Sequence, residues 1–101
     1  DAYAGAAELF LPMADALDRA AELAPEDKGI DALRKQLTDI FGRLGITEIE
    51  SDGKPFDPTL HNAIMHEDDE SQPESTVVQT FQRGYRLGDK VIRHAMVKVV
   101  N

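Results

Sequence analysis

Apolar residues recur at intervals of three and four over the first 45 residues, which is the spacing along one face of an α-helix. This pattern predicts helices over residues 3–24 and 27–44, joined by the short break APEDKG at 24–29. The apolar residues at these intervals form a narrow seam on each helix: Phe10, Met13, Leu17, Ala20 and Ala24 on the first, and Ile30, Leu33, Leu37, Ile40 and Leu44 on the second. Two narrow seams cannot enclose a core alone. We therefore expect the large seam residues to be the dimer contacts of a four-helix bundle built from two helical hairpins.

Proline and glycine mark where these helices bend, begin and end. Pro12 lies inside the first apolar pattern, where a proline either kinks a helix or begins it. Because the apolar spacing continues on both sides, we favour a bend. Gly29 falls at the start of the second helix, where glycine costs up to about 1 kcal/mol relative to alanine. It indicates either a loose first turn or the close approach of another backbone. Gly45 follows the second seam, as expected for a left-handed helix cap.

From residue 46 onward the apolar period shortens to 2, which is typical of β-strands. Four alternating segments follow one another along the chain: 46–50, the surroundings of 63–66, 76–87 and 90–100. Gly88-Asp89 separates the last two and predicts a tight hairpin with glycine at the first central position. The expected fold class is therefore α+β, with a helical dimerisation hairpin over residues 1–45 and a small all-β domain over residues 46–101.

The charge balance narrows the range of partners. The chain of 101 residues carries 19 acidic and 11 basic side chains, for a net charge of −8. Affinity for nucleic acid comes mainly from neutralising phosphates, so this balance argues against a general nucleic-acid binder. Cysteine is absent, which excludes disulfides and thiol catalysis and is consistent with a cytoplasmic location. No apolar run approaches the roughly 20 residues that a membrane helix needs.

Catalytic and metal-binding patterns find little support. His61 and His66 are five residues apart, which is not a recognised ligand spacing, and His94 is remote in sequence. The acidic run HEDDE at 66–70 lacks the alternating ligands and central glycine of a calcium loop. No nucleophile motif or glycine-rich phosphate loop is present. We expect no enzymatic activity, no metal and no cofactor.

The most basic stretch is QRGYRLGDKVIRHAMVKVV, residues 82–100. It contains one acidic residue, Asp89, and five basic residues: Arg83, Arg86, Lys90, Arg93 and Lys98. Lysine and arginine commonly protect an edge strand from pairing, which is the simplest interpretation. The interleaved aromatic, methionine and arginine residues also suit a protein interface or a surface that stacks nucleic-acid bases. The acidic charge of the chain favours a protein partner.

This stretch also carries a family resemblance. FQRGYRLGDKVIRHAMVKV resembles the C-terminal signature of the GrpE family, the nucleotide exchange factors of DnaK-type chaperones. PFDPTLHNAI, LFLPMADALDRAAE and GIDALRKQLTDIFGRLGITEIE are similar to further segments of that family, in the same order. Many members have proline or alanine where His94 stands. The family's long N-terminal stalk helix is missing from this sequence, which begins with Asp1, so we expect a C-terminal part of a longer protein.

The resemblance implies a dimeric four-helix bundle that carries a small β wing on each protomer. One wing would dock on the nucleotide-binding domain of the chaperone and favour its open form, so that ADP leaves. The positions implied to contact the chaperone are Phe56, Pro58, Phe81, Lys90, Val99 and Gly29, whereas Gly84, Tyr85, Ile92 and Met96 are expected to form the fold. Two alternatives remain at this stage: a chaperone-binding or adaptor module without exchange activity, and a nucleic-acid-binding β wing. Thermosensing by the stalk lies outside this sequence.

Overall fold

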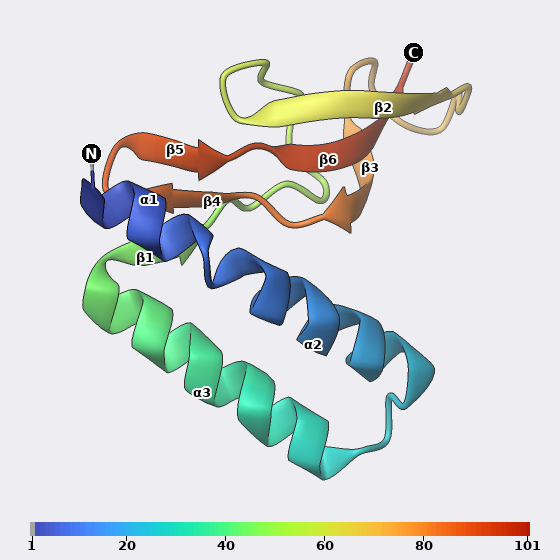
Figure 1. The fold of residues 1–101 in the computed structure, drawn as a ribbon. Coiled ribbons are helices and arrows are strands. Elements are labelled where there is room, and N and C mark those ends of the chain that lie inside the picture. The colour runs from blue at the N-terminus through green and yellow to red at the C-terminus, as the bar shows by residue number, and fades with distance from the viewer. Residues whose placement is uncertain (1) are drawn as a thin grey trace. The chain divides into compact units, whose positions relative to one another are not determined.

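The computed structural model describes residues 2–101 and divides the chain into two compact units (Figure 1). The first, here called the helical unit, ends at Thr47. The second, here called the β unit, comprises Glu48–Asn101. The architecture is α+β, as predicted. Within the described residues, no helix combines the length and apolar character required to cross a bilayer.

The helical unit contains α1 (Ala2–Glu8), α2 (Leu11–Leu23) and α3 (Lys28–Leu44). The helix predicted over 3–24 is thus interrupted at Leu9 and Phe10. Pro12 lies in the first turn of α2, where the missing N–H of a proline needs no helical partner. The bend expected at Pro12 is therefore a short break just before it, after which a new helix begins.

Helices α2 and α3 run side by side in opposite directions (Figure 1). Ala14 and Leu37 are buried in this unit, and Asp18 of α2 forms an ion pair with Arg34 of α3 at 3.2 Å. The hydroxyl of Tyr3 donates to the carbonyl of Leu44 at 2.7 Å and so links α1 to the end of α3. These contacts confirm the helical hairpin.

Both ends of α3 carry caps that the local sequence explains. Asp27 has extended backbone, and its carboxylate accepts hydrogen bonds from the N–H groups of Gly29 at 2.8 Å and Ile30 at 3.2 Å. Gly45 has a φ of 81°, which confirms the predicted left-handed cap. A Cβ at Gly29 would meet only the Asp27 carboxylate, at 3.1 Å, so no other backbone of the described chain approaches this glycine.

In the described residues the strands form two three-stranded sheets. One has the order β1 (Ile46–Glu48), β4 (Tyr85–Leu87), β5 (Lys90–Arg93). The other has the order β2 (His61–Glu67), β6 (Ala95–Val100), β3 (Val77–Gln82), with β2 parallel and β3 antiparallel to β6. Strand β2 is longer than the segment predicted around 63–66.

The alternating segments 76–87 and 90–100 each contain two strands and not one. Each segment is divided, by Arg83-Gly84 in the first and by His94 in the second, and its two halves join different sheets. A close backbone approach accounts for the division, because a Cβ on Gly84 would lie only 2.4 Å from the backbone nitrogen of Ala95. The predicted tight hairpin is present: Leu87 pairs with Lys90, and Gly88 has a φ of 58°.

The β unit has a core of small and β-branched side chains. Val77, Ala95, Val97 and Val99 form one buried cluster, against which Phe56 and Ala63 pack. Three of these residues alternate along β6, as expected for a strand with one buried face. Met96 occupies the opposite face of β6 and is 37% exposed, so it contributes to the fold through its place on the central strand and not through this buried cluster.

Candidate protein-binding surfaces

The basic stretch uses much of its charge inside the β unit. Arg83 forms an ion pair with Glu48 at 2.6 Å, and Lys98 forms one with Glu67 at 3.3 Å. The Arg93 side chain donates from Nε to the carbonyl of Arg83 at 3.0 Å. These contacts hold the strands around the division at Gly84. They leave a smaller part of the positive charge available to a partner than the sequence suggested.

The remaining basic residues lie on the β4–β5 hairpin. Arg86 and Lys90 are both exposed, and Lys90 follows directly after the turn at Gly88-Asp89. Tyr85, by contrast, is only 3% exposed, and the guanidinium groups of Arg83 and Arg93 lie over its ring at 5.7 and 5.6 Å. A buried, covered ring is not available to stack on a base, which disfavours the nucleic-acid alternative.

The Asp57-Pro58 segment forms a rigid turn. The Asp57 carboxylate accepts from the Thr59 hydroxyl at 2.7 Å and from the Thr59 N–H at 2.9 Å. The hydrogen bond from the Thr59 hydroxyl, and to a lesser extent that from the Thr59 N–H, lowers the pKa of Asp57. The Asp57 N–H donates to Nδ1 of His61 at 3.0 Å, while the Asp57 carbonyl accepts from the N–H of His61 at 2.8 Å. Pro58 is therefore presented on an ordered, exposed turn.

His61 lies at the base of this turn and is 3% exposed. Burial lowers the pKa of His61, which favours the neutral ring at neutral pH. Its ring lies 5.9 Å from that of Phe56, centroid to centroid. Phe56 is half-buried and also packs on the valine core, so it supports the turn as well as bordering the surface. No group of three metal-ligating side chains is assembled anywhere in residues 2–101.

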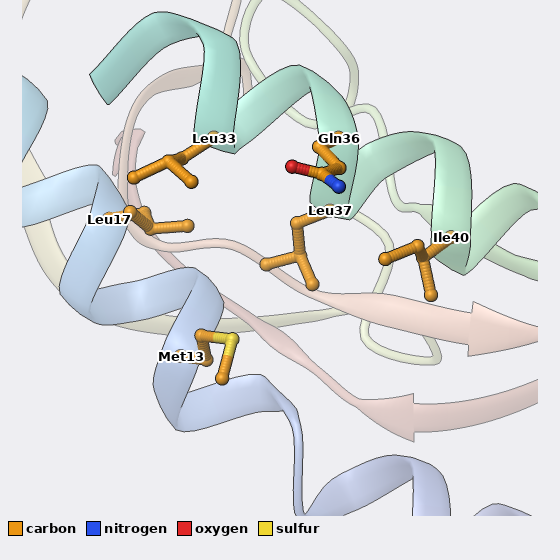
Figure 2. A pocket seen from close by; sticks show the side chains of 6 residues that line it. All are labelled: Met13, Leu17, Leu33, Gln36, Leu37 and Ile40. Atoms are coloured by element: carbon orange, nitrogen blue, oxygen red, sulfur yellow. The ribbon is translucent and has the colours of Figure 1, made fainter. Parts of the chain in front are cut away.

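The helical unit exposes an apolar groove between α2 and α3. Figure 2 shows side chains from the two helices pointing toward the space between them. The groove has a volume of about 330 Å³ and is lined by Met13, Leu17, Leu33, Gln36, Leu37 and Ile40. Most of these belong to the predicted seams. Several seam residues are far more exposed than core residues: Phe10 48%, Met13 55%, Leu33 53%, Ile40 46% and Leu44 37%.

Comparison with known proteins decides the family. The family model described as GrpE matches residues 1–101, the whole chain. The chain belongs to the GrpE family. The protein GrpE of Clostridium acetobutylicum is 50% identical, in an alignment that covers 100% of this chain and 52% of that protein. The protein GrpE of Clostridium beijerinckii is 46% identical, with coverages of 100% and 50%.

A more distant GrpE relative, that of Synechococcus elongatus, is 41% identical over 89% of this chain and 47% of its own length. The chain therefore spans about half the length of the curated GrpE proteins it matches. The match includes both the helical unit and the β unit, which agrees with the family segments recognised along the sequence.

The GrpE resemblance implied six contact positions, and these positions differ in how exposed they are. Pro58, Phe81 and Lys90 are exposed in the β unit, and Phe81 exposes 41% of its surface. Gly29 is exposed in the first turn of α3. Val99 is only 4% exposed and belongs to the core cluster, so its side chain serves the fold. Alternation along β6 could have indicated this, because Val99 shares a face with the fully buried Ala95.

One exposed apolar feature of this GrpE chain was not recognised in the sequence. Ile64 and Met65 on β2 are 48% and 50% exposed. The pairing of β2 shifts register between Ala63 and Met65, so the simple alternation of inward and outward side chains fails there. The absence of lysine and arginine from residues 55–82 was the signal that this side of the β unit differs from the basic hairpin.

Proposed function

We propose that this chain is the dimerisation and docking part of a cytoplasmic nucleotide exchange factor. It would dock its β unit on the nucleotide-binding domain of a DnaK-type chaperone and promote release of ADP. The observation that carries this proposal is the GrpE match over the whole chain, together with an exposed Lys90 on the hairpin of the C-terminal signature.

Exchange requires only a difference in binding affinity between two forms of the chaperone. A factor that binds the open, nucleotide-free form better shifts the population toward that form. By reciprocity, bound nucleotide weakens the factor by the same amount. The factor catalyses no bond making or breaking in this scheme, so it acts as a co-chaperone and not as an enzyme.

The exposed side chains of the β unit supply a suitable docking surface. Lys90 and Arg86 carry positive charge on the hairpin, and Pro58 and Phe81 add apolar surface from an ordered turn and from β3. Charge complementarity raises association rates and orients the partners, while the aromatic contact supplies affinity. We assign the chaperone contacts to these groups together with Phe56 and Gly29. Val99 supports them from the core.

We assign dimerisation to residues 1–45 and docking to the wing, residues 46–101. Exposed seam residues line an apolar groove that a single hairpin leaves uncovered. A second hairpin placed against it would bury Met13, Leu33 and Ile40 and complete a four-helix bundle. Burying such side chains contributes on the order of 1.5–3 kcal/mol each relative to leaving them in water.

The proposal is tested by charge reversal at Lys90. We expect Lys90→Glu to slow the release of labelled ADP that this chain stimulates from the chaperone by about tenfold or more, because loss of a close charge pair at an interface costs at least 1.4 kcal/mol. Lys35→Glu makes the same charge change on an exposed position of α3 and should leave the rate unchanged. Equal rates for Lys90→Glu and the original chain would overturn the contact assignment. Chaperone binding without release would instead identify an adaptor.

A further inference from the structure

One edge of the sheet β2-β6-β3 is open. Strand β2 is at the end of the sheet order β2-β6-β3, and among residues 2–101 it pairs with β6 alone (Figure 1). The corresponding edge of β3 is partly covered, because Val77 exchanges backbone hydrogen bonds with Gly53 and Lys54 at 2.8 and 2.9 Å. On the outer side of β2, the only backbone hydrogen bond within residues 2–101 is that of the His61 N–H to the Asp57 carbonyl.

The ladder with β6 shows which peptide groups of β2 face outward. The carbonyls of Leu60 and Glu67 accept from Ala95 N at 3.1 Å and Asn101 N at 3.0 Å, so both face β6. Peptide groups alternate in direction along a strand. Alternation from Leu60 at one end and from Glu67 at the other means that the N–H and C=O groups of Ala63 and His66 point away from β6. They form an unpaired row along the edge.

This edge lacks the usual protection against strand addition. Edge strands are commonly short, or carry lysine, proline or inward-pointing charge. Strand β2 has seven residues, and its first six, HNAIMH, include no lysine, arginine, aspartate, glutamate or proline. Ile64 and Met65 stand about half exposed on it. The bulge beside them is a protective feature, yet it leaves both of these apolar side chains at the surface.

The charge around this edge selects one kind of occupant. Residues 55–82 contain six acidic residues and no lysine or arginine. Four of the acids end β2 or directly follow it: Glu67, Asp68, Asp69 and Glu70. Lys98 neutralises Glu67, and Asp69 is bonded to Ser71, whereas Glu70 is exposed. A basic segment is therefore favoured near the C-terminal end of β2, while apolar side chains are favoured along it.

We propose that β2 binds an extended, unstructured polypeptide segment as an added antiparallel strand. Antiparallel pairing is the slightly more stable arrangement, and it places the N-terminal end of the added segment beside the acidic residues after Glu67. The segment therefore carries basic residues at its N-terminal end and apolar residues at alternate positions after them. This surface is acidic and apolar, unlike the basic hairpin, and binding there would be a function additional to nucleotide exchange.

The test uses a synthetic peptide that begins with two lysines and continues with alternating valine and threonine, labelled with fluorescein at its C-terminal end. Fluorescence anisotropy against increasing protein should show saturable binding that weakens with salt. Moving the lysines to the C-terminal end should weaken binding by about threefold or more, because they then lie away from the acidic residues. A peptide N-methylated at alternate residues keeps its side chains but loses its backbone donors, and should not bind.

Protein variants locate the site. His66→Pro removes an outward N–H and should weaken binding about tenfold or more, since main-chain hydrogen bonds supply the affinity of strand addition. Glu70→Gln leaves the strand intact and should reduce the salt dependence of binding. Lys90→Glu should leave peptide affinity unchanged. A failure of peptide binding is thus independent of any failure in nucleotide exchange.

Amide hydrogen exchange supplies the decisive outcome. Bound peptide should slow exchange at the N–H groups of Ala63 and His66 and leave Arg86 and Lys90 on the hairpin unaffected. The proposal is overturned by an absence of binding up to millimolar protein, by equal binding of the N-methylated peptide, or by binding without protection of Ala63 and His66.

Discussion

Gly84 lies between β3 and β4, where the chain passes from one sheet to the other, and replacing it tests this description of the fold. A Cβ at this position would lie 2.4 Å from the backbone nitrogen of Ala95 and 2.9 Å from the carbonyl oxygen of Arg93. The Gly84 carbonyl also accepts from the N–H of Ile49 at 2.9 Å. Because the atoms in the way are backbone and not the end of a flexible side chain, Gly84→Ala forces the strands apart.

The size of the effect follows from opposing contributions. Overpacking a closely packed site typically costs about 1–3 kcal/mol, and a clash with backbone places this site at the upper end. Alanine also restricts the unfolded chain, which offsets about 0.4–1 kcal/mol. We therefore expect Gly84→Ala to lower the free energy of unfolding of the β unit by about 2 kcal/mol, more than a tenfold change in the unfolding equilibrium constant.

Urea denaturation, followed through the amide NMR signals of Val97 and Val99, measures this loss in the β unit alone. Gly88→Ala is the matched control. It adds the same methyl group at a φ of 58°, where no atom of the other described residues beyond its two chain neighbours lies within 4 Å. It therefore carries the left-handed penalty of roughly 1–2 kcal/mol, less the same unfolded-chain contribution, and no clash. Unfolding of Gly84→Ala at the same urea concentration as the original chain, or an unchanged Ala95 amide environment, would contradict the close packing of Gly84 against Ala95.

Three further predictions concern the helix cap, the helical groove and the buried histidine. Asp27→Ala removes the carboxylate that caps α3 and should lower the stability of the helical unit by about 1 kcal/mol in thermal denaturation, whereas Glu26→Ala should not. Leu33→Asp should halve the mass measured by sedimentation without unfolding the β unit; an unchanged mass would place dimerisation elsewhere. The pKa of His61 in the folded chain is lowered from its usual 6.5, so the unfolded chain takes up a proton more readily. The free energy of unfolding should therefore fall as the pH drops below 6.5, by at most about 1.4 kcal/mol per pH unit. His61→Asn retains an acceptor for the Asp57 N–H and should flatten this slope below pH 6.5; a slope that persists would assign the titration to another group.

Local rules predicted the parts of the fold that depend on neighbouring residues. The helical hairpin follows from the seam spacing, the end of α3 from Gly45, and the tight turn from Gly88. Each of these features needs only a few consecutive residues. The break before Pro12 was displaced by only two residues from the predicted bend, because a proline fits both a kink and a first helical turn.

Contacts between distant segments could not be predicted in the same way. The division at Gly84 depends on the backbone of Ala95, eleven residues later, and nothing local distinguishes it from a glycine in a continuous strand. The parallel pairing of β2 with β6 brings Ala63 against the valine core in the same manner. The family resemblance identified exposed Lys90 and Pro58 but included Val99, since a motif does not tell which face of a strand is buried.

The central claim is that this chain opens a DnaK-type chaperone for nucleotide exchange. Its most direct test is stopped-flow release of labelled ADP from such a chaperone, with the chain added above the concentration at which it dimerises. The account predicts an accelerated release whose rate rises with the concentration of the chain and saturates. Release at the intrinsic rate, at every concentration of a folded dimer, would contradict it.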